Sequence, residues 1–121
     1  GKGSLTVLTH YPPHEAALAC IIEKNGEKVA KRFEIYHEGV ELANGYHECA
    51  DATELRRRFE EENAIRLSQQ KPAYHLDEAF LLAMRSFPDC CGVSVGFDRA
   101  LMLRRKAKSL KEVLPFAWSS G

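Results

Sequence analysis

Residues 32–48, RFEIYHEGVELANGYHE, hold the strongest fold signal in the chain. Apolar Phe33 and Ile35 alternate with polar neighbours, which is the period of a half-buried strand. Glu38–Gly39 is a tight-turn pair, so residues 40–48 are expected to return antiparallel as the second strand of a hairpin.

The turn also predicts how residues pair across this hairpin. With a two-residue turn, Tyr36 faces Glu41 and Glu34 faces Ala43, which makes Glu34 and Glu41 diagonal neighbours on one face. Two carboxylates at that range repel each other unless a cation or a base lies between them. From the pattern alone, two solvated glutamates are the more ordinary interpretation. The sharper hypothesis is a Mg²⁺ site, because hard cations take oxygen ligands and bridge carboxylates to phosphates.

The end of the second strand leaves two arrangements open. Gly45 in mid-strand indicates a β-bulge or the close approach of a ligand. A bulge would turn Asn44, Tyr46 and Glu48 toward the same pocket as Glu41. Without a bulge, strand alternation puts Asn44 and Glu41 on opposite faces, and the pattern does not decide between the two.

Outward from the hairpin, the sequence predicts strands at both ends of a helical middle. The further strands are expected at 5–9 and 91–96, and helices at 51–68, 77–87 and 97–105. Asp51 with Glu54 is spaced like a capping box, and so is Ser109 with Glu112, which would begin a short final helix. With no internal repeat or interdomain linker, residues 1–121 are interpreted as one α+β domain, an antiparallel sheet flanked by helices.

Composition excludes several classes of function. Lys plus Arg and Asp plus Glu number 17 each among 121 residues, so the net charge is zero and binding of nucleic acid by bulk charge is disfavoured. Arg56–Arg58 followed by Glu60–Glu62 neutralises itself at helical spacing, which favours a solvated helix face over an RNA contact. No apolar run approaches the roughly 18 residues of a membrane span, and no signal-peptide pattern opens the chain.

The cysteines indicate a reducing compartment, and hence the cytoplasm. Cys20, Cys49, Cys90 and Cys91 form no C-x-x-C pair, and adjacent cysteines rarely bridge, so free thiols are the simplest interpretation. His47 and Cys49 could at most share one metal ion, and a transition-metal site is therefore disfavoured.

A second group of residues with chemical potential is Gly96-Phe97-Asp98-Arg99. It places Arg99 directly after a glycine-containing strand, in the first turn of a helix. A guanidinium there could stack on a flat base and contact a phosphate. The ordinary alternative is that Asp98 caps the helix and that Arg99 lies on the surface.

Taken in chain order, these segments resemble the C-terminal part of the catalytic domain of class II lysyl-tRNA synthetases. The resemblance runs from about Leu5 to Trp118, and the last of its segments resembles motif 3, the strand–helix unit that binds ATP. Within the family, the sequences around 44–48 and 88–90 are more similar to a paralogous group, the elongation factor P–(R)-β-lysine ligases. The segments on which the resemblance to the lysyl-tRNA synthetases rests are Tyr11–Pro12, Arg32–Glu34, Glu41–Glu48, Asp51, Arg58–Phe59, Pro88–Asp89 and Gly92–Leu103.

The resemblance implies a role for each matching residue. Glu34 and Glu41 match the pair that holds Mg²⁺ on the ATP phosphates, and Arg99 matches the catalytic motif 3 arginine that packs on adenine and reaches the γ-phosphate. Asn44 matches the asparagine near the substrate carboxylate and Tyr46 an aromatic wall of the amino-acid pocket. Glu48 matches the acid that pairs with the distal amine of lysine.

Two departures from the family pattern affect what the resemblance implies. Ser94 stands where lysyl-tRNA synthetases usually have glycine and the paralogous ligases have alanine, so it is expected to alter which amino acid fits. Motifs 1 and 2 precede this region in the family and are not in this sequence. The chain is therefore expected to be a piece of a longer protein and to hold half of an adenylation site.

The implied parent is a homodimeric ligase that uses ATP and Mg²⁺ to activate lysine or β-lysine and transfers it to a lysine of elongation factor P. No membrane partner is expected. Two alternatives stay open. One is a true lysyl-tRNA synthetase, with tRNA as the acceptor. The other is a synthetase-like module that binds a partner and catalyses nothing.

Overall fold

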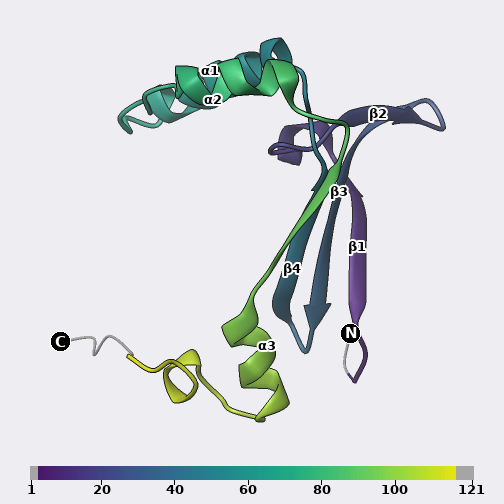
Figure 1. The fold of residues 1–121 in the computed structure, drawn as a ribbon, viewed down its shortest axis with the longest axis vertical. Helices are drawn as coiled ribbons and strands as arrows, with labels where there is room; N and C mark the ends of the chain where they lie inside the picture. Colours follow the sequence, from purple (N-terminus) through teal and green to yellow (C-terminus); the bar gives the residue numbers. More distant parts are fainter. Residues whose placement is uncertain (1–2, 117–121) are drawn as a thin grey trace.

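A computed structural model describes residues 3–116 of the chain, so Trp118, at the end of the family resemblance, lies outside the described residues. Five strands form one antiparallel sheet in the order β1-β3-β4-β5, with β2 also paired to β3 (Figure 1). The predicted α+β class, an antiparallel sheet flanked by helices, is confirmed. The strands are β1 (Thr6–Tyr11), β2 (Ile21–Lys24), β3 (Glu27–His37), β4 (Val40–His47) and β5 (Cys91–Val95).

Helices lie at both ends of the sheet. α1 (Ala52–Ser68) and α2 (Glu78–Ala83) lie together at one end, and α3 (Phe97–Arg104) follows β5 at the other (Figure 1). Single 3-10 turns span Pro13–Glu15, Met84–Ser86 and Leu110–Glu112. The helix predicted at 77–87 is thus shorter, because the chain tightens into a 3-10 turn at Met84 before Pro88. No helix in the part of the chain that the structure describes is long and apolar enough to cross a membrane.

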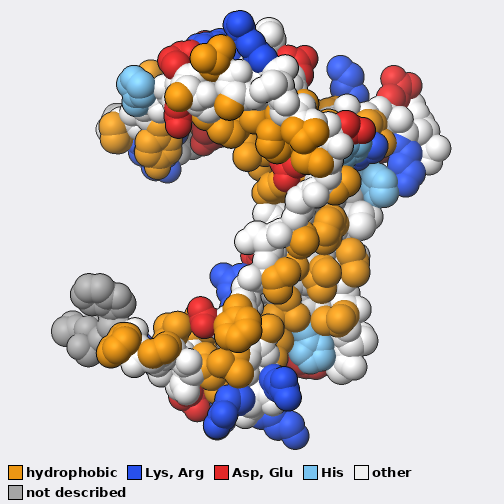
Figure 2. Space-filling model, in the orientation of Figure 1, with side chains coloured by type: hydrophobic (Ala, Val, Ile, Leu, Met, Phe, Trp, Pro, Cys, Tyr) orange, Lys and Arg blue, Asp and Glu red, His pale blue; other side chains and the backbone are white. Residues whose placement is uncertain are grey.

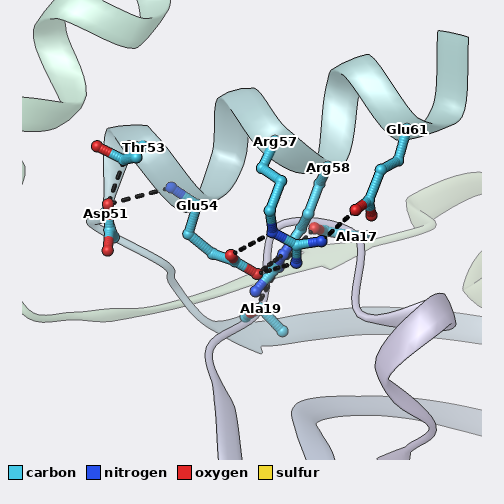
Figure 3. Close-up of polar contacts among 8 residues, drawn as sticks. All are labelled: Ala17, Ala19, Asp51, Thr53, Glu54, Arg57, Arg58 and Glu61. Atoms are coloured by element: carbon cyan, nitrogen blue, oxygen red, sulfur yellow. Dashed lines mark hydrogen bonds and ion pairs between the residues drawn. The ribbon is translucent and has the colours of Figure 1, made fainter.

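The helix starts follow the capping signals with one exception. The Asp51 carboxylate accepts hydrogen bonds from the amides of Thr53 and Glu54, which satisfies the first turn of α1. Ser109 and Glu112 form the predicted capping box. Glu54 does not complete a box with Asp51. Its carboxylate instead accepts hydrogen bonds from the guanidinium groups of Arg57 and Arg58 (Figure 3).

The central hairpin contains a β-bulge that changes the predicted pairing. Tyr36 pairs with Glu41 as expected, but Ile35 then pairs with Ala43, so Leu42 is the extra residue. Glu34 therefore pairs with Asn44 and not with Ala43. The turn itself is the predicted one: Glu38 and Gly39 both have positive φ, 49° and 76°, as a tight hairpin turn requires.

The core is small and lies at the α1 end of the sheet. One cluster joins Cys49 to Leu55, Leu81 and Met84 beneath α1 and α2, and a second joins Ala16, Ala19 and Ala30. By contrast, one face of the sheet is apolar and open. Val7, Val93 and Val95 lie on it at 55%, 58% and 60% exposure, and Figure 2 shows hydrophobic side chains over the strands.

Candidate functional site

The opposite face of the sheet brings the predicted site residues together. Directly opposed residues of antiparallel strands share a face, and the pairs here are Tyr36–Glu41, Glu34–Asn44 and Arg32–Tyr46 between β3 and β4. Between β4 and β5, Asn44 pairs with Ser94 and Tyr46 with Gly92. The prediction that Glu34 and Glu41 share one face is confirmed. The bulge at Leu42 also puts Asn44 on the face of Glu41, which the sequence left undecided.

Glu34 is the one buried charged residue among those described, at 7% exposure. Its carboxylate accepts hydrogen bonds from the Tyr36 hydroxyl and the Arg32 guanidinium. The bond from Tyr36, together with Tyr11 and Arg32, holds the Glu34 pKa below its ordinary value despite burial. Glu34 is thus an ionised, oriented carboxylate at neutral pH.

Arg99 reaches from α3 to the start of β4. Its Nη1 donates to the Glu41 carbonyl oxygen at 3.0 Å and lies 3.6 Å from Glu41 Oε2. Both side chains are open to solvent, at 45% and 38% exposure. Gly96 is the N-cap of α3 and no side chain caps this helix, so the alternative that Asp98 is the cap is wrong. A Cβ on Gly96 would lie 3.3 Å from Arg99 Cδ, so glycine leaves room for the arginine to fold back.

The other end of the face is built around Glu48. A Cβ on Gly92 would lie 2.5 Å from Glu48 Oε1, so the carboxylate occupies the space that glycine leaves on β5. Burial raises the Glu48 pKa above its ordinary value, partly offset by His47. Nearby, Asn44 Nδ2 donates to the Tyr46 hydroxyl at 2.6 Å. Ser94 is exposed on the same face.

The structure requires glycine at position 45 for a reason other than the β-bulge or the close approach of a ligand that the sequence suggested. It lies opposite Phe33 on the other face, and a Cβ there would stand 2.5 Å from the Phe33 ring and 2.8 Å from the Gly92 carbonyl oxygen. The bulge is at Leu42, and the close approach at Gly45 is that of protein atoms. Glycine is needed so that β4 can pass beneath this ring.

The structure adds Arg32, which had no role of its own in the sequence analysis. Its Nε donates to Asn44 Oδ1 at 3.2 Å and its Nη1 to the Glu15 carbonyl oxygen at 2.8 Å. Its guanidinium carbon lies 4.5 Å from the centre of the Tyr11 ring. Strand alternation from Glu34 would have placed Arg32 on this face, so the signal was present.

Tyr11 is the second residue that sequence reasoning missed. Its hydroxyl is buried and makes no hydrogen bond of ordinary geometry within residues 3–116, but it lies close enough to the Glu34 carboxylate to affect the pKa of that group. Burial raises its pKa, and so does the nearby Glu34 carboxylate. Tyr11 thus closes one side of the Glu34–Arg32 pair as a neutral aromatic wall.

The donor set of this face fits Mg²⁺ better than a transition metal. Glu34 and Glu41 offer carboxylate oxygens, the ligands that Mg²⁺ prefers, and two carboxylates leave positions for phosphate oxygens. His47 and Cys49 do not combine. The His47 ring is bonded to Lys31 and Asp89, and Cys49 is buried in the core. No group of three or more His, Cys, Asp or Glu side chains among the described residues could hold a metal ion.

The sequence matches a known family model over nearly the whole chain. The family model for class II tRNA synthetases (D, K and N) matches residues 1–120. Because this match covers almost every residue, the chain belongs to the class II tRNA synthetases of the D, K and N group.

Proposed function

We propose that the chain is the C-terminal part of an adenylate-forming ligase for a lysine-type amino acid. The observation that carries this proposal is the division of one sheet face into two ends. Glu34, Glu41 and Arg99 form an end suited to a metal–phosphate group, and Glu48 lies at the other end in a partly buried position. A lysine-type amino acid carries its carboxylate and its side-chain amine far apart, so its two charged groups need binding groups at two separate ends of the face.

In the proposed reaction these groups act together to form an aminoacyl-adenylate. The amino-acid carboxylate attacks the α-phosphorus of ATP, the bond to the β-phosphate oxygen breaks, and pyrophosphate leaves. Glu34 and Glu41 would hold the Mg²⁺ that neutralises phosphate charge, and Arg99 would contact the adenine and the γ-phosphate. Glu48 would bind the ammonium group of the side chain, while Asn44 and Tyr46 would line the pocket between the ends.

The acceptor in this proposal is a lysine of elongation factor P, and the amino acid is (R)-β-lysine. The ε-amine of the acceptor lysine attacks the adenylate carbonyl, AMP leaves and an amide forms. Ser94 supports this choice, because its side chain faces Asn44 where synthetases of this type usually have glycine. A homodimeric longer protein would supply motifs 1 and 2. A true lysyl-tRNA synthetase and a non-catalytic module are the alternatives.

The test uses the full-length protein that contains these 121 residues. We expect lysine-dependent or β-lysine-dependent pyrophosphate exchange, and transfer of the activated amino acid to elongation factor P. Glu41→Gln should lower the exchange rate at least about 100-fold, since a metal-binding charge is lost. Glu27→Gln, at the exposed far end of β3, is the control and should exchange normally.

Each alternative gives its own result. Transfer to tRNA instead of elongation factor P would identify a synthetase. Absence of exchange with both amino acids would favour the partner-binding module and would overturn the proposal.

A further inference from the structure

We propose that Arg32 is a positioning residue, which orients the Asn44 amide so that the pocket recognises the carboxylate of the amino acid. The inference rests on the proposed function, because it takes the face around Asn44 as the amino-acid pocket. Its observation is separate, however. It comes from the hydrogen bonds of Arg32, a residue to which the proposed function assigns no role.

Arg32 is held from every side in the middle of the face. Nη2 bonds to Glu34, Nη1 bonds to the Glu15 carbonyl, and the guanidinium lies over the Tyr11 ring. The side chain is 18% exposed. Because the two Nη groups of Arg32 bond to Glu34 and Glu15, Arg32 donates to Asn44 through the hydrogen on Nε.

A guanidinium nitrogen can only donate, and this decides the orientation of the amide. Asn44 must turn Oδ1 toward Arg32, and its Nδ2 group then points the other way. One Nδ2 hydrogen goes to the Tyr46 hydroxyl, and the second has no acceptor among residues 3–116. A flipped amide would present oxygen lone pairs and repel a carboxylate. The observed orientation presents a free N–H donor, which attracts one.

Arg32 also couples the Asn44 amide to the proposed metal end of the face. The same guanidinium that orients Asn44 is paired with Glu34, the buried carboxylate at the proposed metal end. Glu34 and Asn44 are directly opposed on β3 and β4, and the one Arg32 side chain bonds to both. A shift of either group would therefore move the other.

The main test variant is Arg32→Lys in the full-length protein. Lysine keeps a positive charge for Glu34 but lacks the fixed Nε donor. We expect the KM for the amino acid in pyrophosphate exchange to rise about 10- to 100-fold, the range for one hydrogen bond to a charged group. The inhibition constant of 1,5-diaminopentane, which has both amines and no carboxylate, should change less than twofold. Arg105→Lys, an exposed arginine after α3, is the matched control.

Asn44→Ala separates an effect through Asn44 from a general loosening. If Arg32 acts through the amide, the double variant should have the same amino-acid KM as Asn44→Ala alone. Additive effects, or equal weakening of the amino acid and the diamine, would overturn the inference. If Arg32→Lys does not fold, as judged by thermal unfolding, Arg32→Met, which has no side-chain N–H donor, is measured in the same way.

The outcome for the wild-type protein separates the two proposals. Wild-type exchange combined with an unchanged KM in Arg32→Lys would defeat the role of Arg32 and leave the proposed function standing. A wild-type protein that neither exchanges pyrophosphate nor binds lysine would defeat both.

Discussion

At the residue scale, Glu48 combines a proposed role in substrate recognition with a cost to the stability of the fold. Its carboxylate lies in the space over Gly92, and burial raises its pKa. A carboxyl group with a folded pKa above its unfolded value destabilises the folded state as pH rises through the folded pKa and the group ionises. A bound ammonium ion would remove that cost, because an opposite charge favours the ionised form.

We predict that Glu48→Gln raises the melting temperature of the unliganded protein at pH 7 and weakens lysine binding about 10- to 100-fold. The gain in melting temperature should vanish near pH 4, where the wild-type carboxyl group is protonated. Thermal unfolding across pH and calorimetric lysine titration measure the two effects. A lower melting temperature at pH 7 would show that the charge of Glu48 is compensated in the free protein.

Ser94 is the residue on which, in the proposed function, the choice of amino acid depends. It faces Asn44 across β4 and β5 and is exposed, so its side chain is not part of the core. We predict that Ser94→Gly raises kcat/KM for α-lysine relative to β-lysine about tenfold to a few hundredfold, the range for one small group in a pocket. The two isomers differ near the backbone, where the removed hydroxymethyl group would leave room.

Melting temperature measured alongside gives the control for Ser94→Gly. An unchanged ratio with a lowered melting temperature would mean that the serine only stiffens β5. A changed ratio at an unchanged melting temperature is the expected result.

Strand alternation in the sequence predicted which site residues share a face only where the strands pair without a bulge. Glu34 and Glu41 were expected on one face, and they share it. The position of Asn44 depended on the bulge at Leu42, and a bulged leucine leaves no mark that distinguishes it from an ordinary strand residue. Arg32 could have been placed on the face by alternation from Glu34, but its bonds to Glu15 and Asn44 come from tertiary structure.

At the element scale, α1 is joined to the segment between β1 and β2 by charged side chains, while Leu55 packs it against Cys49, Leu81 and Met84. Arg58 donates from Nη1 to the carbonyl oxygens of Ala17 and Ala19. Its Nε donates to Glu54 Oε1 at 2.8 Å (Figure 3). The expected self-neutralising helix face is confirmed for Arg57, which pairs with Glu54 and Glu61. Arg58 also pairs with Glu54 of the same helix, but it is only 13% exposed, so the expectation of a solvated face is wrong for this residue.

We predict that Glu54→Gln destabilises the protein by about 1–2 kcal/mol at pH 7, because a braced, partly buried carboxylate is lost. Hydrogen bonds from Arg57 and Arg58 lower the Glu54 pKa to about 2. Since the folded pKa is below the unfolded value, this stability is present above about pH 4.5 and is lost as pH falls toward 2. Urea unfolding at pH 7 and at pH 2.5 should show the difference shrinking.

Glu61→Gln is the matched control for Glu54. It removes the other partner of Arg57 from the same helix, but both side chains are more than half exposed, and such pairs are worth little. Equal destabilisation by both variants would mean that Glu54 acts as an ordinary surface charge and not through Arg58.

The prediction of the elements also had a physical limit. Strong signals held: the tight turn at Glu38–Gly39, the Asp51 cap and the Ser109 box. The hairpin of β2 with the first half of β3 was not predicted. Its strands are short or charged, and it is stabilised by pairing with the rest of the sheet.

At the scale of the whole molecule, helices lie at the two ends of the sheet, and little of the chain covers the faces of the sheet between them. Leu55 is the one large side chain with less than 2% exposure among the described residues, and the apolar face with Val7, Val93 and Val95 is open. Figure 1 shows α1 and α2 at one end of the sheet and α3 at the other, with no helix across the middle. Monomeric proteins rarely leave such a surface bare.

This openness also limits what the 121 residues can do alone. The proposed ATP end consists of Glu34, Glu41 and Arg99, and the last two are 38% and 45% exposed. An electrostatic site in contact with water gains little from each charge, since the high dielectric screens it. We therefore predict that the isolated chain binds ATP weakly or not at all and forms no adenylate.

Pyrophosphate exchange and calorimetric ATP titration on the isolated chain, with the full-length protein in parallel, test this prediction. Exchange by the isolated chain with lysine or β-lysine would contradict it, because three side chains on an open face would then suffice for phosphoryl chemistry. Exchange by the full-length protein alone is the expected result. It would mean that a second wall over this face supplies the remaining phosphate contacts and excludes the water that screens Arg99.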